Sequence, residues 1–188
     1  MKFSKRPLSI YAAILLLLAG CSDGSDSSTA QDITLHDSGD GKPKVAVVMK
    51  ALNSEYFKLM EAGAKKAFKD FEVDGTVLAP SNETEVEKQI NMLEDLLNQD
   101  IDALVVMPSQ SEAAIPVLEK YKAKGIPVLL ADSDVEWDGK TTFIGTDNYT
   151  AGLEAGKALA SQLKKGDKIA VLEGVLGTPT SEERVKGG

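Results

Sequence analysis

From residue 44 onward, the hydrophobic pattern alternates between short unbroken apolar runs and longer amphipathic stretches. An unbroken apolar run is typical of a strand that helices cover on both faces, as in a parallel sheet. We therefore predict strands at six such runs: KVAVVMK (44–50), GTVLAPS (75–81), IDALVVMPS (101–109), IPVLLAD (126–132), FIGT (143–146) and KIAVLEG (168–174).

The amphipathic stretches between these runs predict helices, because their apolar residues recur three or four positions apart. The first helix is expected to begin near Ser54, a good capping residue. The third contains Pro116, so its regular part is expected to begin near that proline. The others are expected over the stripe from Val86 to Leu97, over 149–165, and from SEERVKGG (181–188) onward.

This alternation predicts an α/β fold with a parallel open sheet, helices on both faces and right-handed crossovers. In such sheets, ligands bind beyond the carboxyl ends of the strands, near the point where the strand order reverses. Lys50, Ser109, Asp132 and the segment from Gly174 onward fall at predicted carboxyl ends. A ligand site is therefore expected at this edge.

The first 42 residues do not follow the strand–helix pattern. Residues 1–20 join a basic start to a short apolar stretch, LSIYAAILLLLAG, which predicts an export signal. The stretch runs into LAGC, which matches a lipobox, so Cys21 is the predicted lipidation site and the chain is expected to be anchored to a membrane. The rest of residues 21–42 is rich in Ser, Asp and Gly and is predicted to be a flexible tether.

Charge and composition exclude several function classes. The formal net charge of −8 opposes binding to a phosphate backbone, so no nucleic-acid partner is expected. The only histidine, His36, lies in the tether, so it offers neither a general base nor a metal cluster to the folded part. Glycine-rich cofactor loops and the G-x-S-x-G motif are absent. We predict no catalysis, no metal and no cofactor.

The side chains at the predicted strand ends suit a sugar. Tyr56 and Phe57 offer flat apolar faces, and Lys50 donates hydrogen bonds. Asp132 accepts from two hydroxyls, and Arg184 donates in a planar fork. Plainer roles stay open for each: a lysine extending to water, a core phenylalanine, a turn-capping aspartate and a surface arginine.

Four segments resemble type I periplasmic solute-binding proteins for monosaccharides, and among these the ribose- and D-allose-binding proteins of ABC importers. They are VAVVMKALNSEYF, KGIPVLLADSD, FIGTDNYTAG and LEGVLGTPTSEERVKGG, in the family's order. The resemblance implies ligand contacts at Lys50, Ser54, Tyr56, Phe57, Asp132 and Arg184. The chain departs from the family pattern at Glu55, where a proline is common, and at Ser133, where ribose binders carry an arginine.

The resemblance also implies a domain organisation and a function. An N-terminal lobe would span 43–145, and 146–188 would be the incomplete start of a second lobe. The protein would be an exported, lipid-anchored monomer facing the periplasm or the cell exterior, which captures a monosaccharide and passes it to ABC permease subunits. With one lobe incomplete, the chain by itself is expected to bind sugar no tighter than roughly millimolar. The alternative is a sensory protein that presents a sugar or quorum-type signal to a chemoreceptor or histidine kinase; an exported enzyme ranks third.

Overall fold

The computed structural model describes residues 41–188. The predicted signal peptide (1–20), Cys21 and nearly all of the predicted tether lie outside the described residues. Within them, no helix combines the length and apolar character that crossing a membrane requires.

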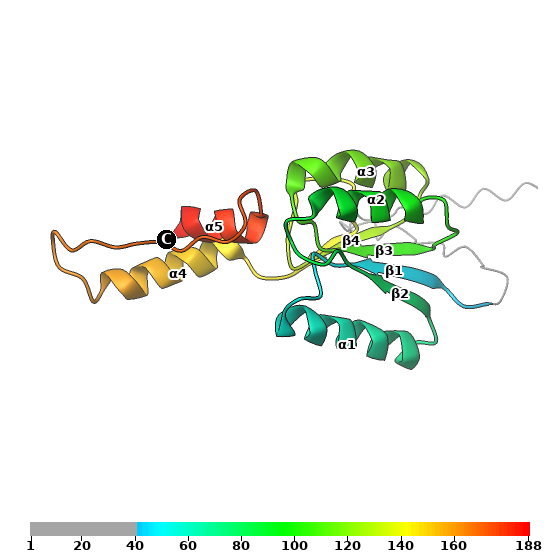
Figure 1. Ribbon diagram of the computed structural model, residues 1–188, viewed down its shortest axis with the longest axis horizontal. Helices are drawn as coiled ribbons and strands as arrows, with labels where there is room; N and C mark the ends of the chain where they lie inside the picture. The colour runs from blue at the N-terminus through cyan, green and yellow to red at the C-terminus, as the bar shows by residue number, and fades with distance from the viewer. Residues whose placement is uncertain (1–40) are drawn as a thin grey trace, which may run out of the picture. The chain divides into compact units, whose positions relative to one another are not determined.

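Five parallel strands form one sheet in the order β2-β1-β3-β4-β5 (Figure 1). They are β1 (Lys44–Val48), β2 (Asp74–Leu78), β3 (Ala103–Val106), β4 (Val128–Ala131) and β5 (Thr142–Ile144). The helices are α1 (Glu55–Asp70), α2 (Val86–Leu96), α3 (Ser111–Ala123), α4 (Asn148–Ala160) and α5 (Pro179–Gly187). The first five predicted strands are confirmed.

Helices cover both faces of this sheet, which confirms the predicted fold class. Helices α2 and α3 lie on one face and α1 on the other (Figure 1). Each face has its own core, because successive side chains of a strand point to opposite faces. Val48 and Val106 pack with the α2–α3 core, whereas Val47 and Met49 pack with the α1 core. Both sides of β1 are therefore apolar, which explains its unbroken run.

Helix α3 begins earlier than predicted. It starts at Ser111, so Pro116 lies inside the helix and not near its start. Proline removes one helical hydrogen bond and disfavours a continuous helix. Here the buried side chains of Ala114, Val117 and Leu118 anchor both sides of the proline to the core, and packing of this kind contributes most of a helix's stability. Tertiary burial therefore outweighs the local cost.

The predicted strand at 168–174 is wrong. The segment has no regular structure, and the apolar side chains of Ile169, Val171 and Leu172 are exposed. A strand needs a neighbour to pair its backbone N–H and C=O groups. Among the described residues, no strand lies beside this segment. An apolar run alone is not sufficient for a strand.

Helices α1 and α3 end in the same way but with different residues. After α1, Glu72 has a left-handed backbone with φ 54°, and Val73 N donates to Phe68 O at 2.9 Å. After α3, Gly125 has φ 72°, and Ile126 N donates to Tyr121 O at 3.0 Å. Glycine adopts this conformation at no steric cost, whereas a residue with a Cβ is strained.

Glu72→Gly is therefore expected to stabilise the protein by about 0.5–1 kcal/mol, because it relieves the left-handed strain after α1. The matched control is Gly125→Ala, which introduces the same strain after α3 and should destabilise by about 1 kcal/mol. Urea unfolding followed by circular dichroism measures both. A destabilised Glu72→Gly variant would contradict the assignment of strain to this residue.

Candidate functional site

Lys50 and Asp132 meet at the carboxyl edge of the sheet, although they follow strands that are not neighbours. Strand β3 lies between β1 and β4. Continuing the strand register two residues beyond Val48 and its partners brings Lys50, Pro108 and Asp132 level with one another. The lysine and the aspartate thus pair across the end of β3, where Pro108 has no N–H to donate.

The pair is an ion pair shielded from water. Lys50 Nζ lies 2.8 Å from Asp132 Oδ2, and the two side chains are 2% and 14% exposed. A buried ammonium is costly unless a charged partner compensates it. The alternative in which Lys50 extends to water is therefore wrong. The lysine that follows β1 therefore pairs with the carboxylate of Asp132 at the carboxyl edge of the sheet.

Asp132 has a left-handed backbone with φ 61°. Its N–H donates to Ile144 O on β5 at 3.0 Å, which ties this turn to the sheet. Aspartate tolerates this conformation better than most residues, and such strain is concentrated at functional sites. Its carboxylate contacts Lys50 and Tyr56, two side chains far away in the sequence, so Asp132 does more than cap its own turn.

Tyr56 completes the cluster. Its hydroxyl donates to Asp132 Oδ1 at 2.7 Å, while 54% of the residue stays exposed. Burial, followed by the hydrogen bond to Asp132 and the charge of Asp132, raises the pKa of Tyr56 to about 12, and the positive charge of Arg184 opposes this rise. The phenol is therefore neutral at physiological pH and acts as a donor.

Ser54 and Phe57 hold Tyr56 from the start of α1. Ser54 is the N-cap, as predicted, and its Oγ accepts a hydrogen bond from Phe57 N at 3.4 Å. Phe57 is buried in the α1 core, and its ring packs edge-on against Tyr56 with centroids 5.2 Å apart. The core role is thus observed for Phe57. The ligand contacts of both residues stay predictions.

Gln89, which the sequence analysis did not select, joins two strand ends at the carboxyl edge of the sheet by hydrogen bonds. It is 1% exposed and donates from Nε2 to Met49 O (3.0 Å) and Met107 O (2.9 Å). Its Oε1 accepts from Ser109 N at 2.9 Å. One amide thereby joins the ends of β1 and β3, next to Lys50. A sequence signal existed, because Gln89 interrupts the apolar face of α2 between Val86 and Leu93.

Arg184 belongs to α5, which packs against α4 through glycines. A Cβ added at Gly152 would lie 2.1 Å from Arg184 O, and one at Gly156 would lie 2.7 Å from Gly188 O. The helices therefore touch backbone to backbone. In the described part of the chain, no hydrogen bond or ion pair joins Arg184 to Lys50, Tyr56 or Asp132. The structure brings Lys50, Tyr56 and Asp132 into direct contact, whereas Arg184 on α5 acts on this cluster through its charge, which opposes the rise in the pKa of Tyr56.

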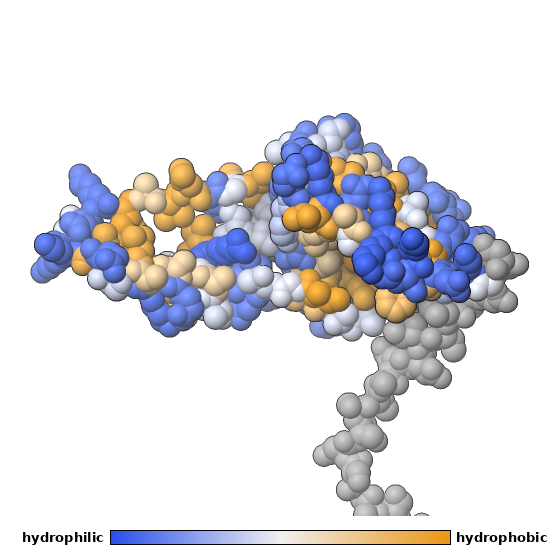
Figure 2. Space-filling model, turned by 90° about the horizontal axis from the view of Figure 1, so that it is seen from below, coloured by the Kyte–Doolittle hydropathy of each residue, from blue (hydrophilic) through white to orange (hydrophobic). Residues whose placement is uncertain are grey.

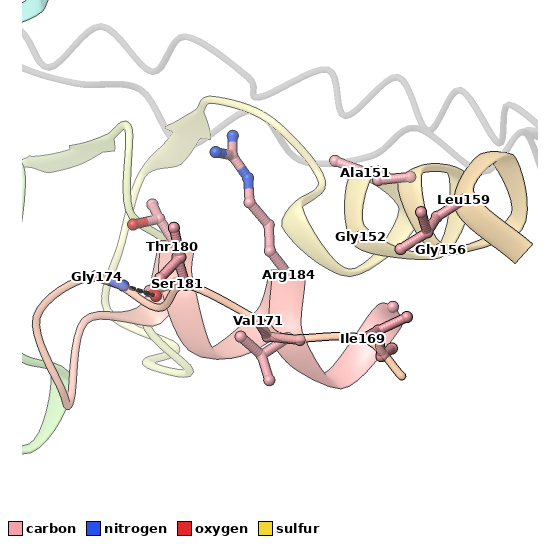
Figure 3. A pocket seen from close by; sticks show the side chains of 14 residues that line it. Ala151, Gly152, Gly156, Leu159, Ile169, Val171, Gly174, Thr180, Ser181 and Arg184 are labelled. Carbon is pink, nitrogen blue, oxygen red and sulfur yellow. Dashed lines mark hydrogen bonds between the residues drawn. The ribbon is translucent and has the colours of Figure 1, made fainter. Parts of the chain in front are cut away.

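A cavity of about 680 Å³ lies among α4, α5 and the segment from Ile169 to Gly174 (Figure 3). It is mainly apolar, and the guanidinium of Arg184 points away from Ile169 and Val171 (Figure 3). Figure 2 shows apolar surface over the same part of the chain. Lys50, Tyr56 and Asp132 do not line this cavity. We therefore assign it to loose packing beside the irregular segment and not to sugar binding.

A parallel open sheet with a charged and aromatic cluster at its carboxyl edge is the arrangement expected of one lobe of a solute-binding protein. Residues 45–188 match the periplasmic binding protein domain family, and the chain belongs to this family.

Curated relatives and solved structures agree with this assignment. The chain is 34% identical to a D-ribose/D-allose-binding protein of Pseudomonas aeruginosa (78% of this chain, 48% of the relative) and 30% identical to a ribose import binding protein of Bacillus subtilis (97% and 59%). A solute-binding protein structure from Actinobacillus succinogenes with bound D-allose aligns with a TM-score of 0.67 at 32% identity (78% and 53%). The chain spans about half the length of the curated relatives it matches.

Gly152→Ala is expected to loosen α5, because the new methyl group would collide with the backbone of Arg184. Amide exchange in α5 should become at least about tenfold faster, since local opening free energies set these rates. The matched control is Gly63→Ala in α1, where a Cβ meets nothing within 4 Å. That change should leave α5 unaltered and stabilise α1 by about 0.5–1 kcal/mol. Equal exchange rates in both variants would contradict the glycine-dependent packing.

Proposed function

We propose that this protein captures a monosaccharide outside the cytoplasm and delivers it to an ABC transporter without catalysing a reaction. The observation that carries this proposal is the cluster of Lys50, Asp132 and Tyr56 at the carboxyl edge of the sheet. The names of the relatives support the same substrate class. One is a D-ribose/D-allose-binding protein, and one solved structure contains D-allose.

The cluster offers the groups that a sugar ring requires. A carboxylate accepts from two hydroxyls, and an ammonium has three donors, of which Asp132 engages one. The half-exposed Tyr56 ring adds a flat face for the C–H groups of the sugar. D-allose and related aldoses are therefore the first ligands to test. Ser133, in place of the arginine of ribose binders, favours an allose-type ligand over ribose.

The chemistry of the cluster supports binding and not turnover. The described residues contain neither histidine nor cysteine. The Asp132 carboxylate is engaged by an ammonium and a phenol, and the one serine hydroxyl near it, that of Ser133, is fully buried and lies 3.5 Å away, at the limit of a hydrogen bond. Nucleophilic catalysis requires a nucleophile–base pair in close hydrogen-bond contact. This arrangement suits recognition of a neutral polyol.

The rest of the predicted organisation belongs to the same proposal. Residues 43–145 form the N-terminal lobe, and 146–188 begin a second lobe whose Arg184 reaches the ligand when the lobes close about their hinge. Cys21 carries the lipid anchor, and the tether of 21–42 gives the exported monomer freedom to meet the permease. The proposed location is a bacterial membrane, with the lipid-anchored protein facing the periplasm or the cell exterior.

Asp132→Ala is expected to weaken binding of D-allose more than Lys50→Ala does, in the longest form of the protein that its gene encodes. The carboxylate serves two ligand hydroxyls, and each lost partner costs about 1–3 kcal/mol. Isothermal titration calorimetry measures both affinities. Asp134→Ala, two residues further on at the exposed Lys140 ion pair, is the control and should bind as the unaltered protein does.

Circular dichroism melting is needed beside the calorimetry, because removing one partner of a buried ion pair also destabilises the fold. Asp132→Asn keeps the side-chain shape but leaves Lys50 uncompensated, so its melting temperature shows how much of the effect comes from the broken ion pair. If neither Asp132→Ala nor Lys50→Ala changes affinity by tenfold while both stay folded, the binding site lies elsewhere.

Cys21→Ala is expected to abolish lipid anchoring, because the thiol of LAGC is the proposed acylation site. Metabolic labelling with radioactive palmitate should disappear, and the protein should move from the membrane fraction to soluble or unprocessed material. A neighbouring change, Ser22→Ala, serves as the control and should retain the label. Labelling that survives Cys21→Ala would rule out acylation at this residue.

A further inference from the structure

Both oxygens of the Asp132 carboxylate have partners in the free protein. Oδ2 faces Lys50 Nζ at 2.8 Å and is 3.5 Å from the hydroxyl of Ser133, while Oδ1 accepts from the Tyr56 hydroxyl at 2.7 Å. A carboxylate oxygen can accept two hydrogen bonds. The Tyr56 hydroxyl therefore occupies one acceptor position of Asp132 Oδ1 before a ligand arrives.

The two main partners differ in how accessible they are. Lys50 is 2% exposed, and its neutralisation depends on Asp132. Tyr56 is 54% exposed and carries no charge that needs compensation. A ligand arriving from solvent meets the tyrosine first, and displacing the tyrosine leaves no buried charge unpaired. Tyr56, and not Lys50, is thus the partner whose hydrogen bond to Asp132 a ligand can displace.

Release of the Tyr56 hydroxyl requires only a side-chain movement. The backbone at the start of α1 is fixed by the Ser54 cap, and the buried ring of Phe57 lies behind Tyr56. Exposed side chains change rotamer in picoseconds to nanoseconds, far faster than lobe closure. The hydroxyl can therefore leave Asp132 without disturbing α1.

We propose that the Tyr56 hydroxyl is a latch that holds Asp132 Oδ1 in the free protein and is displaced by a ligand hydroxyl. This inference rests on the proposed function and deepens it, because it makes Tyr56 a determinant of selectivity. A ligand that donates two adjacent hydroxyls to Asp132 replaces the lost hydrogen bond and gains a second. A ligand that donates a single hydroxyl replaces the Tyr56 hydrogen bond with one of its own and gains none.

The test is Tyr56→Phe, which keeps the ring and removes the hydroxyl. Affinities for D-allose, D-ribose and glycerol are measured by calorimetry on the longest encoded form of the protein. Without the latch, D-allose should bind roughly three- to tenfold more tightly, the equivalent of one net hydrogen bond. The matched control is Tyr121→Phe, whose hydroxyl donates to Leu93 O in the core. That variant should lose stability and keep its affinity.

A second readout follows the hydroxyl itself. In protein labelled with ¹³C at tyrosine Cζ, the Tyr56 resonance is assigned by its absence in Tyr56→Phe. Saturating D-allose should move this resonance toward the position of a tyrosine that is hydrogen-bonded to water.

The outcomes separate the two proposals. Equal or weaker binding by Tyr56→Phe, or an unmoved Tyr56 resonance at saturation, would overturn the latch and leave sugar capture intact. Binding that is detectable only in Tyr56→Phe would support both. The absence of binding by either form to D-allose and D-ribose would overturn the proposed function, and the latch with it.

Discussion

The buried ammonium of Lys50, at the end of β1, determines which residues surround it at the carboxyl edge of the sheet. Lys50 has almost no contact with water, so its ammonium requires a carboxylate close by. The pair lies across the end of β3. Pro108 follows β3 level with both residues in the strand register, and it has no backbone N–H that would compete for the carboxylate.

The same requirement sets the character of the remaining contacts. Asp132 must keep its charge to neutralise Lys50, and it therefore stays a strong acceptor for any donor that reaches it. The aromatic turn supplies the first such donor, Tyr56, held in place by a helix cap and by a core phenylalanine. The sugar-binding chemistry that we propose thus depends on a structural ion pair and not on a separately assembled site.

The sequence predicted those features that depend on local pattern and on position along a strand. Unbroken apolar runs located β1 to β5, and the rule that ligands bind at carboxyl ends selected Lys50 and Asp132 before any geometry was known. The run at 168–174 has the same pattern but no neighbouring strand within residues 41–188, and no window of sequence contains that information.

Features that depend on three-dimensional register were beyond prediction. Gln89 can bond to both strand ends only because β1 and β3 end level with its position on α2. Gly152 lies against the backbone of Arg184 because of the path that α5 takes. Helix α3 continues through Pro116 because of what its neighbours bury, and the sequence does not specify those neighbours. Each case is decided by a partner far away in the chain.

The amide of Gln89 limits which insertions and deletions the sheet tolerates. Because one side chain spans two strand ends with bonds of 2.9–3.0 Å, an inserted or deleted residue in β1 or β3 would separate the ends and pull Lys50 away from Asp132. Beyond Met49 and Lys50, residues 51–54 of the turn before α1 make no hydrogen bond to the end of β3 in the described part of the chain. Divergence toward new ligands is therefore expected to proceed by exchanging side chains in residues 51–56, while the lengths of the strands stay constant.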